Sequence, residues 1–400
     1  MRHLLLTAAM AACAAPEDVP DELTGPARLA ADLGLDVHLG QAVAAEVDTE
    51  DGVTTTTFAD DSGPLCLRGG PFRAATRPGP SDDLLIFLQG GGACWSDFCL
   101  AVNQAPPGMP GVDALLPDLE ANPFRAMDVA YAPYCDASLF SGRADLDDDG
   151  DGTPDRFHRG LQNLSATLDL AVAAFPDPPR VVLAGSSGGG YGTILGALLV
   201  RRVFPDAELV VLADSGSGVA RGAADPGFVR GLLEEQGSLG FVPPDCVGCI
   251  DDGHVTGLLH WTLERDPTLR IGLFSSWYDS IIGDVFLRVA PEAFRDELAA
   301  QTDALHAAFP DRYRRFLVDG RTHTTLLGDP TGIIGSDLGA VELPPGALDL
   351  RELDIGELDT TAVGDLAFST WAQALVDGDL GVWVDTVEPA GAPPGDEEPP

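Results

Sequence analysis

Short apolar runs alternate with longer amphipathic stretches along most of the chain. The runs that predict strands buried on both faces are residues 84–88, 127–131, 181–184, 209–212, 271–274 and 316–318. Helical patterns occupy residues 160–175, 191–203 and 293–309, between several of these runs. This repetition predicts an α/β fold with a mostly parallel sheet and helices on both faces. Functional groups in such sheets lie at the carboxyl ends of the strands.

The first 50 residues do not follow this pattern. Residues 1–13 have a basic start and a short apolar run, which is typical of an export signal and too short to span a membrane. Met10-Ala-Ala-Cys13 resembles a lipoprotein cleavage box, with Met where Leu is usual. Cys13 is therefore a candidate for lipidation and membrane attachment. Ordinary secretion is one alternative, and a cytoplasmic protein with a chance apolar start is another. Residues 14–50 are expected to be a tether and the entry to the domain.

The rest of the chain is expected to form one domain with a short tail. Residues 51–387 carry the strand and helix pattern, and we expect them to fold together as a monomer. Residues 388–400 are rich in proline and acidic residues, which predicts disorder. The predicted protein is thus secreted or held at the cell envelope.

The net charge of the chain limits the kinds of molecule that it can bind. The formal net charge is −40, and all 23 basic residues are arginines. A surface this negative repels nucleic acid and anionic membranes, because phosphate binding needs clustered basic side chains. No nucleic-acid partner is expected. An adaptation to solubility or salt explains the same charge without reference to any partner.

The most specific motif is Gly185-Ser-Ser-Gly-Gly189. It stands directly after the strand run 181–184 and directly before the helical stretch 191–203. G-x-S-x-G between a strand and a helix is typical of the nucleophile turn of α/β-hydrolases, and it makes Ser187 the candidate nucleophile. A glycine-rich phosphate loop is the alternative, but the Lys of a Walker sequence is missing.

A serine nucleophile needs a base and an acid, which follow it along the chain in this fold. Asp279 comes after the strand run 271–274, with Asp284 and Asp319 as rivals. Of the seven histidines only His306 and His323 follow Asp279, and His306 lies within a helical stretch. His323 is therefore the candidate base and Asp279 the candidate acid.

Three consecutive glycines follow the first buried strand. Acyl transfer needs donors aimed at the developing oxyanion. The backbone N–H groups of Gly91 or Gly92, together with that of Gly188, are the candidate oxyanion hole. A flexible turn is the alternative interpretation of the glycine run.

Six cysteines remain besides Cys13, and an even number is typical of disulfides in an oxidising compartment. Six cysteines permit fifteen pairings. Cys246-Val-Gly-Cys249 suggests a metal or redox pair, but a zinc site would need a second pair of this kind. A structural bridge is the favoured interpretation.

Several motifs together resemble the pectin acetylesterase/Notum family. They stand in the family's order at residues 66–69, 84–95, 132–142, 157–161, 185–193, 212–216 and 277–280. The resemblance implies an α/β-hydrolase fold, esterase activity without an organic cofactor, and the triad Ser187, Asp279 and His323. It also implies disulfides between Cys94 and Cys99 and between Cys66 and Cys135, which leaves Cys246 with Cys249.

The chain departs from the family at three positions near the proposed site. Gln89 stands where Glu is frequent, and Gly188 stands where the family usually has Ala. Gly92-Ala93 occupies the place of a Trp that lines the family's acyl pocket. The last departure leaves the preferred acyl group open.

An acidic segment at residues 145–155 predicts a calcium loop. Carboxylates alternate there with other residues, and Gly152 permits a sharp turn. Ca²⁺ prefers several oxygen ligands at such spacing, although the Glu that ends an EF-hand loop is missing. A solvated acidic loop is the alternative, and a bound ion is expected to be structural. The candidate ligands are Asp145, Asp147, Asp149, Asp151 and Asp155.

These observations predict a serine carboxylesterase that removes acyl groups, with acetyl preferred, from a glycan or a small acylated molecule. One alternative is a non-catalytic, calcium-stabilised binding module on a hydrolase scaffold. Another is a serine hydrolase that acts on lipid, polyester or peptide.

Overall fold

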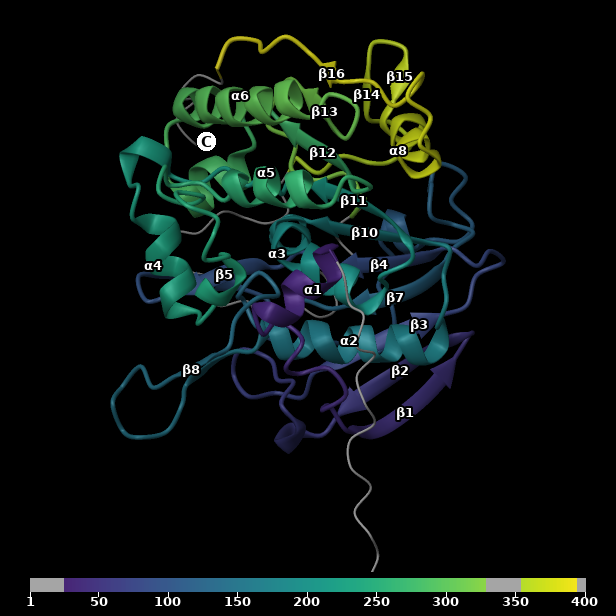
Figure 1. The fold of residues 1–400 in the computed structure, drawn as a ribbon, viewed down its shortest axis with the longest axis vertical. Coiled ribbons are helices and arrows are strands. Elements are labelled where there is room, and N and C mark those ends of the chain that lie inside the picture. Colours follow the sequence, from purple (N-terminus) through teal and green to yellow (C-terminus); the bar gives the residue numbers. More distant parts are fainter. Residues whose placement is uncertain (1–24, 329–353, 394–400) are drawn as a thin grey trace, which may run out of the picture.

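A computed structural model describes residues 25–328 and 354–393, which form a large twisted sheet with helices on both faces (Figure 1). Cys13 and the expected export signal lie outside the described residues. The sheet has the strand order β1-β2-β3-β7-β4-β10-β11-β12-β13-β16 in the described part of the chain. Neighbours from β7 to β16 run parallel, and β1, β2 and β3 extend the sheet by antiparallel pairing.

The strands of the parallel part are β7 (Asp128–Ala132), β4 (Leu84–Leu88), β10 (Arg180–Ser186), β11 (Glu208–Asp214), β12 (Arg270–Ser276), β13 (Tyr313–Val318) and β16 (Thr386–Val387). The antiparallel strands are β1 (Ala44–Glu50), β2 (Val53–Phe58) and β3 (Arg73–Arg77). Three small ribbons stand apart from the sheet: β5 (Gly92–Trp95) with β6 (Phe98–Ala101), β8 (Ala144–Leu146) with β9 (Arg156–His158), and β14 (Ala362–Val363) with β15 (Leu366–Ala367).

The helices are α1 (Gly25–Asp32), α2 (Gly160–Ala174), α3 (Gly188–Val203), α4 (Phe228–Glu235), α5 (Thr256–Arg265), α6 (Pro291–Ala308) and α8 (Phe368–Asp377). A π-helix spans Ile281–Leu287. Short 3-10 turns span Asp60–Ser62, Asp113–Leu115, Gly222–Ala224 and Leu239–Phe241.

Alternate residues of the buried strands supply two hydrophobic cores. On β4, Leu84 and Ile86 belong to the core shared with α1 to α6, whereas Leu85 and Phe87 belong to the core shared with α8. This division follows from the two-residue period of a strand, which sends successive side chains to opposite faces. Because both faces are covered, the strands are apolar throughout, which made them recognisable in the sequence.

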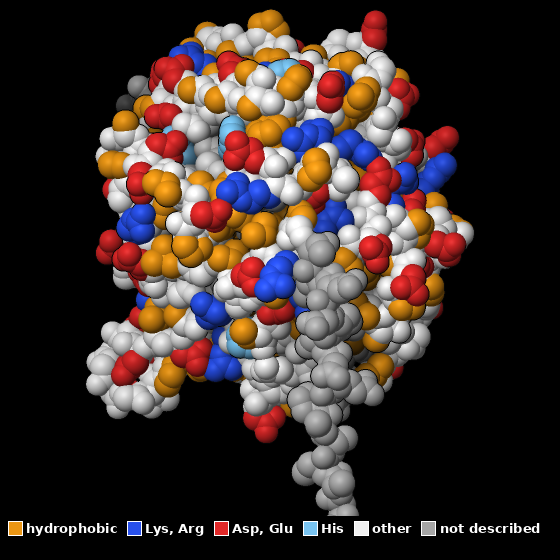
Figure 2. All heavy atoms as spheres, in the orientation of Figure 1, with side chains coloured by type: hydrophobic (Ala, Val, Ile, Leu, Met, Phe, Trp, Pro, Cys, Tyr) orange, Lys and Arg blue, Asp and Glu red, His pale blue; other side chains and the backbone are white. Residues whose placement is uncertain are grey.

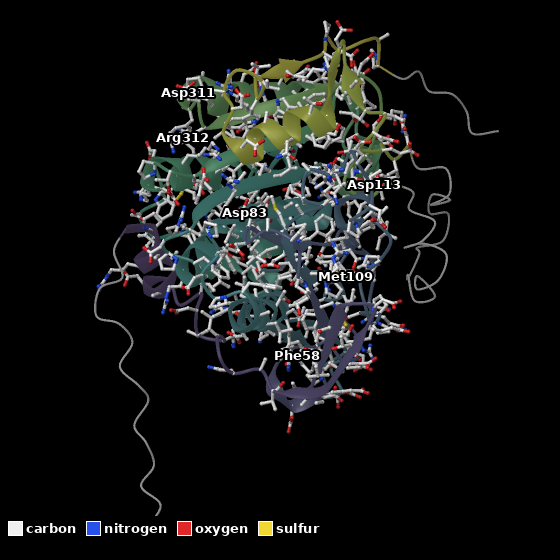
Figure 3. All side chains as sticks on the ribbon, turned by 90° about the vertical axis from the view of Figure 1, so that its right-hand side faces the viewer. Phe58, Asp83, Met109, Asp113, Asp311 and Arg312 are labelled. Carbon is white, nitrogen blue, oxygen red and sulfur yellow. A yellow bond between two sulfur atoms is a disulfide. The ribbon has the colours of Figure 1, made fainter. Side chains whose placement is uncertain are left out.

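The α/β-hydrolase fold expected from the sequence is confirmed. The six predicted strands and three predicted helices are present, and α3 begins at Gly188, three residues before the predicted start. The sequence pattern did not reveal the antiparallel edge, because β1 is exposed along its whole length and has no buried face. Phe58 on β2 and Arg312, just before β13, lie toward opposite ends of the strand order (Figure 3).

The structure describes part of each segment that flanks the expected domain. Residues 25–50, in the segment expected to be a tether and the entry to the domain, include α1, which packs on α3, and β1, which belongs to the sheet. The tail expected to be disordered begins with residues that contact the domain. Glu388 donates its N–H to the C=O of Leu317 at 2.9 Å, and the Tyr278 hydroxyl donates to the C=O of Gly391 at 2.8 Å.

The described residues contain three disulfides, and their pairing is as the family resemblance implied: Cys66–Cys135, Cys94–Cys99 and Cys246–Cys249. They fit an oxidising, extracellular environment. Cys94–Cys99 closes the ribbon of β5 and β6 across directly paired residues. Within residues 25–328 and 354–393, none of the helices combines the length and apolar composition needed to cross a bilayer.

Candidate active site

Ser187 lies in a sharp turn between β10 and α3. Its backbone has φ 55° and ψ −120°, which is rare for a residue with a side chain. Its N–H donates to the C=O of Asp214 at 2.8 Å and so fixes the turn against β11. A Cβ on Gly185 would overlap the C=O of Gly189, which explains why the turn needs glycine beside the serine. The strand, turn and helix are those of a hydrolase nucleophile turn.

The candidate acid and base meet at the carboxyl ends of β12 and β13. Nδ1 of His323 lies 3.0 Å from Oδ1 and 2.9 Å from Oδ2 of Asp279, and both residues are buried. The carboxylate is held by the N–H groups of Ile281 at 3.1 Å and Ile282 at 3.0 Å, at the start of the π-helix. With Nδ1–H donating to Asp279, Nε2 is the basic nitrogen of the ring.

The rival residues are engaged elsewhere. Asp284 pairs with Arg321 at 2.8 Å, and burial raises the pKa of its carboxyl. Asp319 accepts a backbone N–H of the C-terminal segment at 2.8 Å. His306 lies on α6, and its Nδ1 is 2.9 Å from the C=O of Tyr313 on β13. Of Asp279, Asp284 and Asp319, Asp279 is thus the residue whose carboxylate bonds to His323.

The glycine loop after β4 lies against the nucleophile turn. A Cβ on Gly90 would lie 2.9 Å from Cβ of Ser187, and one on Gly188 would lie 2.9 Å from the C=O of Gly92. Gly92 and Gly188 line one pocket together with Ser187, whereas Gly91 packs against Tyr134. Gly188 is the first residue of α3, so its N–H has no acceptor within the helix and is available to an oxyanion.

An apolar pocket opens beside Ser187 and is partly open to solvent. Its walls come from α3, α4, the loop after β11, the π-helix and β5, and none of the described residues that line it is charged. Hydrophobic side chains gather on this face between α4 and α3 (Figure 2). The lining residues are Gly92, Ala93, Trp95, Leu139, Ser187, Gly188, Tyr191, Leu195, Val219, Ala220, Phe228, Val229, Leu232, Leu233, Val255, Ile282, Phe286 and Leu287.

Trp95 supplies the aromatic wall that the family resemblance placed at residues 92–93. Its ring packs edge-on against Phe228 at 5.4 Å and tilted against Phe98 at 4.8 Å. The Cys94–Cys99 disulfide lies within the same ribbon. The aromatic wall is therefore carried by a cross-linked hairpin.

Comparison with known proteins supports the family resemblance. The chain is 28% identical over 156 residues to palmitoleoyl-protein carboxylesterase notum2 of Xenopus laevis, across 36% of this chain and 30% of that protein. The match thus spans less than a third of the relative's length. Two crystal forms of the Wnt deacylase Notum from Drosophila align with TM-scores of 0.53 and 0.55. They are 17% and 16% identical and cover 81% and 83% of this chain, and 92% and 95% of theirs.

This chain resembles Notum in sequence and in fold. No protein-family model matches it. The similarity to the pectin acetylesterase/Notum family that the motifs indicated is confirmed by these relatives. The crystal structures support the fold, because their sequences are too distant from this chain to carry residue roles.

In this Notum-like chain, the sequence reasoning missed one residue at the centre of the site. Asp214 ends β11, and its buried carboxylate accepts hydrogen bonds from the Ser186 hydroxyl at 2.7 Å and from the N–H groups of Thr325 and Leu326, each at 2.9 Å. Burial raises the pKa of Asp214 to about 6. Asp214 belongs to the motif at residues 212–216, but this motif was used only as a sign of family resemblance, and no role was assigned to Asp214.

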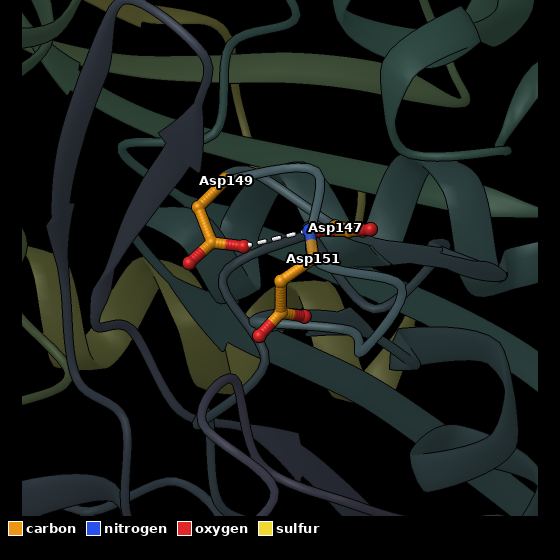
Figure 4. A group of neighbouring side chains, drawn as sticks. All are labelled: Asp147, Asp149 and Asp151. Carbon is orange, nitrogen blue, oxygen red and sulfur yellow. Dashed lines mark hydrogen bonds between the residues drawn. The ribbon is translucent and has the colours of Figure 1, made fainter.

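The acidic loop brings together three of its five candidate ligands. Asp147, Asp149 and Asp151 each offer an oxygen within 4.8 Å of the others, and all three are exposed (Figure 4). Asp145 instead forms a two-point ion pair with Arg159, with distances of 2.9 and 2.6 Å. The carboxylate of Asp155 accepts the N–H of residue 148 at 2.9 Å.

The carboxylates of the loop are partly used by its own backbone. Asp147 accepts N–H groups from Gly150, Asp151 and Gly152 at 2.7 to 3.2 Å. Oxygen donors of this kind suit Ca²⁺. The same bonds suit a solvated turn, so calcium binding stays a prediction.

Proposed function

We propose that the protein is a serine carboxylesterase that releases an apolar acyl group. The observation that carries this proposal is a nucleophile turn and a bonded Asp–His pair at one edge of the sheet, with an uncharged apolar pocket beside the serine. The similarity to proteins named as a carboxylesterase and a deacylase gives it independent support.

The geometry suits acyl transfer through a covalent intermediate. Oγ of Ser187 attacks the acyl carbon while Nε2 of His323 takes the hydroxyl proton, and Asp279 holds the imidazole and stabilises its cation. The N–H groups of Gly92 and Gly188 donate to the oxyanion. The alcohol leaves with the proton from His323, and a water activated by the same nitrogen then releases the acid.

The pocket favours a longer acyl chain than the acetyl group expected from the sequence. An acetyl group would contact few of the apolar side chains that line the pocket from α3, α4, β5 and the π-helix. Each methylene buried there contributes roughly 0.8 kcal/mol. The Xenopus relative is named for a palmitoleoyl group, which is consistent with this preference. For the alcohol part, we propose an acylated glycan or protein without negative charge, because the chain carries −40.

A series of p-nitrophenyl esters from acetyl to palmitoyl tests both parts of the proposal. We expect kcat/KM to rise from acetyl to a medium or long chain. Ser187→Ala should lower turnover by about 10⁶. Ser165→Ala is the matched control, because Ser165 is a buried serine on α2 outside the pocket.

A fluorophosphonate probe gives a second measurement. The wild-type protein should be labelled at Ser187, and the Ser187→Ala variant should not be. A protein that binds the acyl esters but takes up no probe would be a binding module. Turnover retained by Ser187→Ala would place the chemistry elsewhere.

A further inference from the structure

The nucleophile turn and the loop that carries His323 come from distant parts of the chain, and both are tied to the end of β11. Ser187 donates its N–H to the backbone C=O of Asp214, and Ser186 donates its hydroxyl to the Asp214 carboxylate. From the other side, Thr325 and Leu326 donate their N–H groups to the same carboxylate. One side chain therefore joins the segments of the nucleophile and the base.

The neighbouring residue repeats this connection. Oγ of Ser215 accepts the N–H of Thr324 at 3.0 Å, directly after His323 in the chain. The C=O of Asp354 accepts the N–H of His323 itself at 2.7 Å. The backbone is thus held at His323 and at the residue after it, which places the imidazole. Two of the side chains that hold this loop are those of Asp214 and Ser215.

Three of the residues involved have strained backbones. Ser187, Ser215 and Thr324 have φ values of 55°, 57° and 61°, in the left-handed region that residues with side chains seldom adopt. Such conformations persist only where the surrounding bonds determine them. Ser187 and Thr324 are held at the end of β11, by the C=O of Asp214 and Oγ of Ser215, while Ser215 itself donates its N–H to the C=O of Phe274 on β12. Without an acceptor at residue 214, the loop of His323 would lose two buried hydrogen bonds next to a strained residue.

We propose that Asp214 is a positioning residue for the esterase reaction: its carboxylate holds the loop of His323 against the nucleophile turn and so sets the placement of the imidazole relative to Ser187. This inference rests on the proposed function. Asp214 bonds to neither imidazole nitrogen; the carboxylate bonded to Nδ1 is that of Asp279. Its effect is therefore exerted through the backbone of Thr325 and Leu326.

The main test is Asp214→Asn. An amide of the same shape places an NH₂ group where the carboxylate accepts donors, so one buried N–H loses its acceptor. We expect kcat to fall about 10- to 100-fold, because a displacement of about 1 Å costs rates of this size. KM should stay within about threefold, because Asp214 does not line the acyl pocket.

Asp136→Asn is the matched control. Asp136 is as buried as Asp214, and burial likewise raises the pKa of its carboxyl to about 6. It accepts a hydrogen bond from the Ser138 hydroxyl and has no bond to the nucleophile turn or the His323 loop. The same substitution there should leave kcat within about twofold of the wild type.

A proton NMR spectrum reports the geometry without any substrate. The Nδ1 proton shared by His323 and Asp279 should give a far-downfield signal, assigned by its loss in His323→Ala. We expect this signal to shift or broaden in Asp214→Asn and to persist in Asp136→Asn. If the wild type hydrolyses no ester, the proposed function fails, while the signal still shows whether Asp214 places the imidazole.

A double-mutant cycle with His323→Ala separates positioning from a general loss of structure. Asp214→Asn should have less than a twofold effect when His323 is already absent. An equal fall in both backgrounds, or an unchanged kcat and proton signal in Asp214→Asn, would overturn the proposal. If Asp214→Asn fails to fold, Ser215→Ala makes the same test through the N–H of Thr324, with an expected fall in kcat of about tenfold.

Discussion

The proposed catalytic edge of the sheet, which carries Ser187, Asp279 and His323, and the acidic loop at residues 147–155 are both marked by short glycine-containing motifs, yet they are built in opposite ways. At the edge, the bonds of Asp214 and Asp279 reach residues up to 112 positions away, and the side chains are buried. In the acidic loop, the carboxylates of Asp147, Asp149 and Asp151 bond to backbone groups two to five positions away, and all three are exposed. A local motif can fix a turn by itself, whereas a catalytic arrangement requires the whole sheet.

His323→Ala should produce the largest effect and would test the catalytic edge directly. Without the imidazole, no base takes the proton of Ser187, and kcat should fall by about 10⁶. His306→Ala is the control, because that histidine bonds to the backbone of Tyr313 and should leave kcat unchanged. Ester hydrolysis at saturating substrate measures both. A larger loss in His306→Ala would make His306 the base.

Gly92→Ala should have the next largest effect. Gly92 has φ +92°, and a Cβ would overlap the C=O of Leu100 in the paired strand. The displaced loop would misplace an oxyanion donor, and kcat should fall roughly 10²- to 10³-fold.

Gly108→Ala provides the comparison, because Gly108 also has a positive φ of +79° but open space around its Cα. It should cost stability and leave kcat unchanged. Equal losses of kcat in the two variants would mean that backbone strain alone, and not the oxyanion loop, decides activity.

Asp136→Asn should change the difference between the free energies of unfolding at pH 4 and pH 7 by about 1–3 kcal/mol. Burial raises the pKa of Asp136 to about 6, above its usual 3.8, so the folded chain binds this proton more tightly than the unfolded chain. The carboxyl therefore favours the folded state most below about pH 4, and this contribution is lost as the pH rises through about 6.

The amide of the variant does not titrate in this range. The free energy of unfolding of the variant, relative to that of the wild type, should therefore increase from pH 4 to pH 7. Urea unfolding at both pH values measures the difference. A difference that is the same at both values would show that Asp136 does not titrate in this range.

Removal of calcium should have the smallest effect and would test the acidic loop. If the loop binds Ca²⁺, EDTA should lower the Tm by about 2–4 °C, since calcium then stabilises the folded state by about 1 kcal/mol. Asp147→Asn should abolish this response, and kcat should change less than twofold in every case. A Tm that EDTA leaves unchanged would favour a solvated turn, and a collapse of kcat would contradict a purely structural ion.

The sequence predicted the parts of the molecule whose signal is local or periodic. The buried strands are apolar throughout, and the turn around Ser187 requires glycines at fixed positions, so both were recognisable. Asp279 and His323 were predicted from chain order, from their positions after predicted strands and from the helical setting of His306. Asp214 was not assigned a role, because its importance comes from bonds to residues more than 100 positions away.

Other features also depend on tertiary contacts. β1 has no buried face, and the segment after residue 387 contacts β13 and the loops that follow β12 and β13. The size of the acyl pocket depends on how α4, β5 and the π-helix meet, which no single motif encodes. The sequence therefore suggested acetyl, and the assembled walls are the reason that we propose a longer chain.

The C-terminal segment gives the protein an unexpected point of vulnerability. The C=O of Glu388 accepts the indole N–H of Trp277 at 2.6 Å, and that of Gly391 accepts the hydroxyl of Tyr278, the two residues immediately before Asp279. If a protease trimmed the chain at residue 388, or an affinity tag replaced the segment that follows, the two hydrogen bonds to the residues before Asp279 would be lost. None of the proposed catalytic residues would itself be changed. An affinity tag should therefore be placed beyond residue 393.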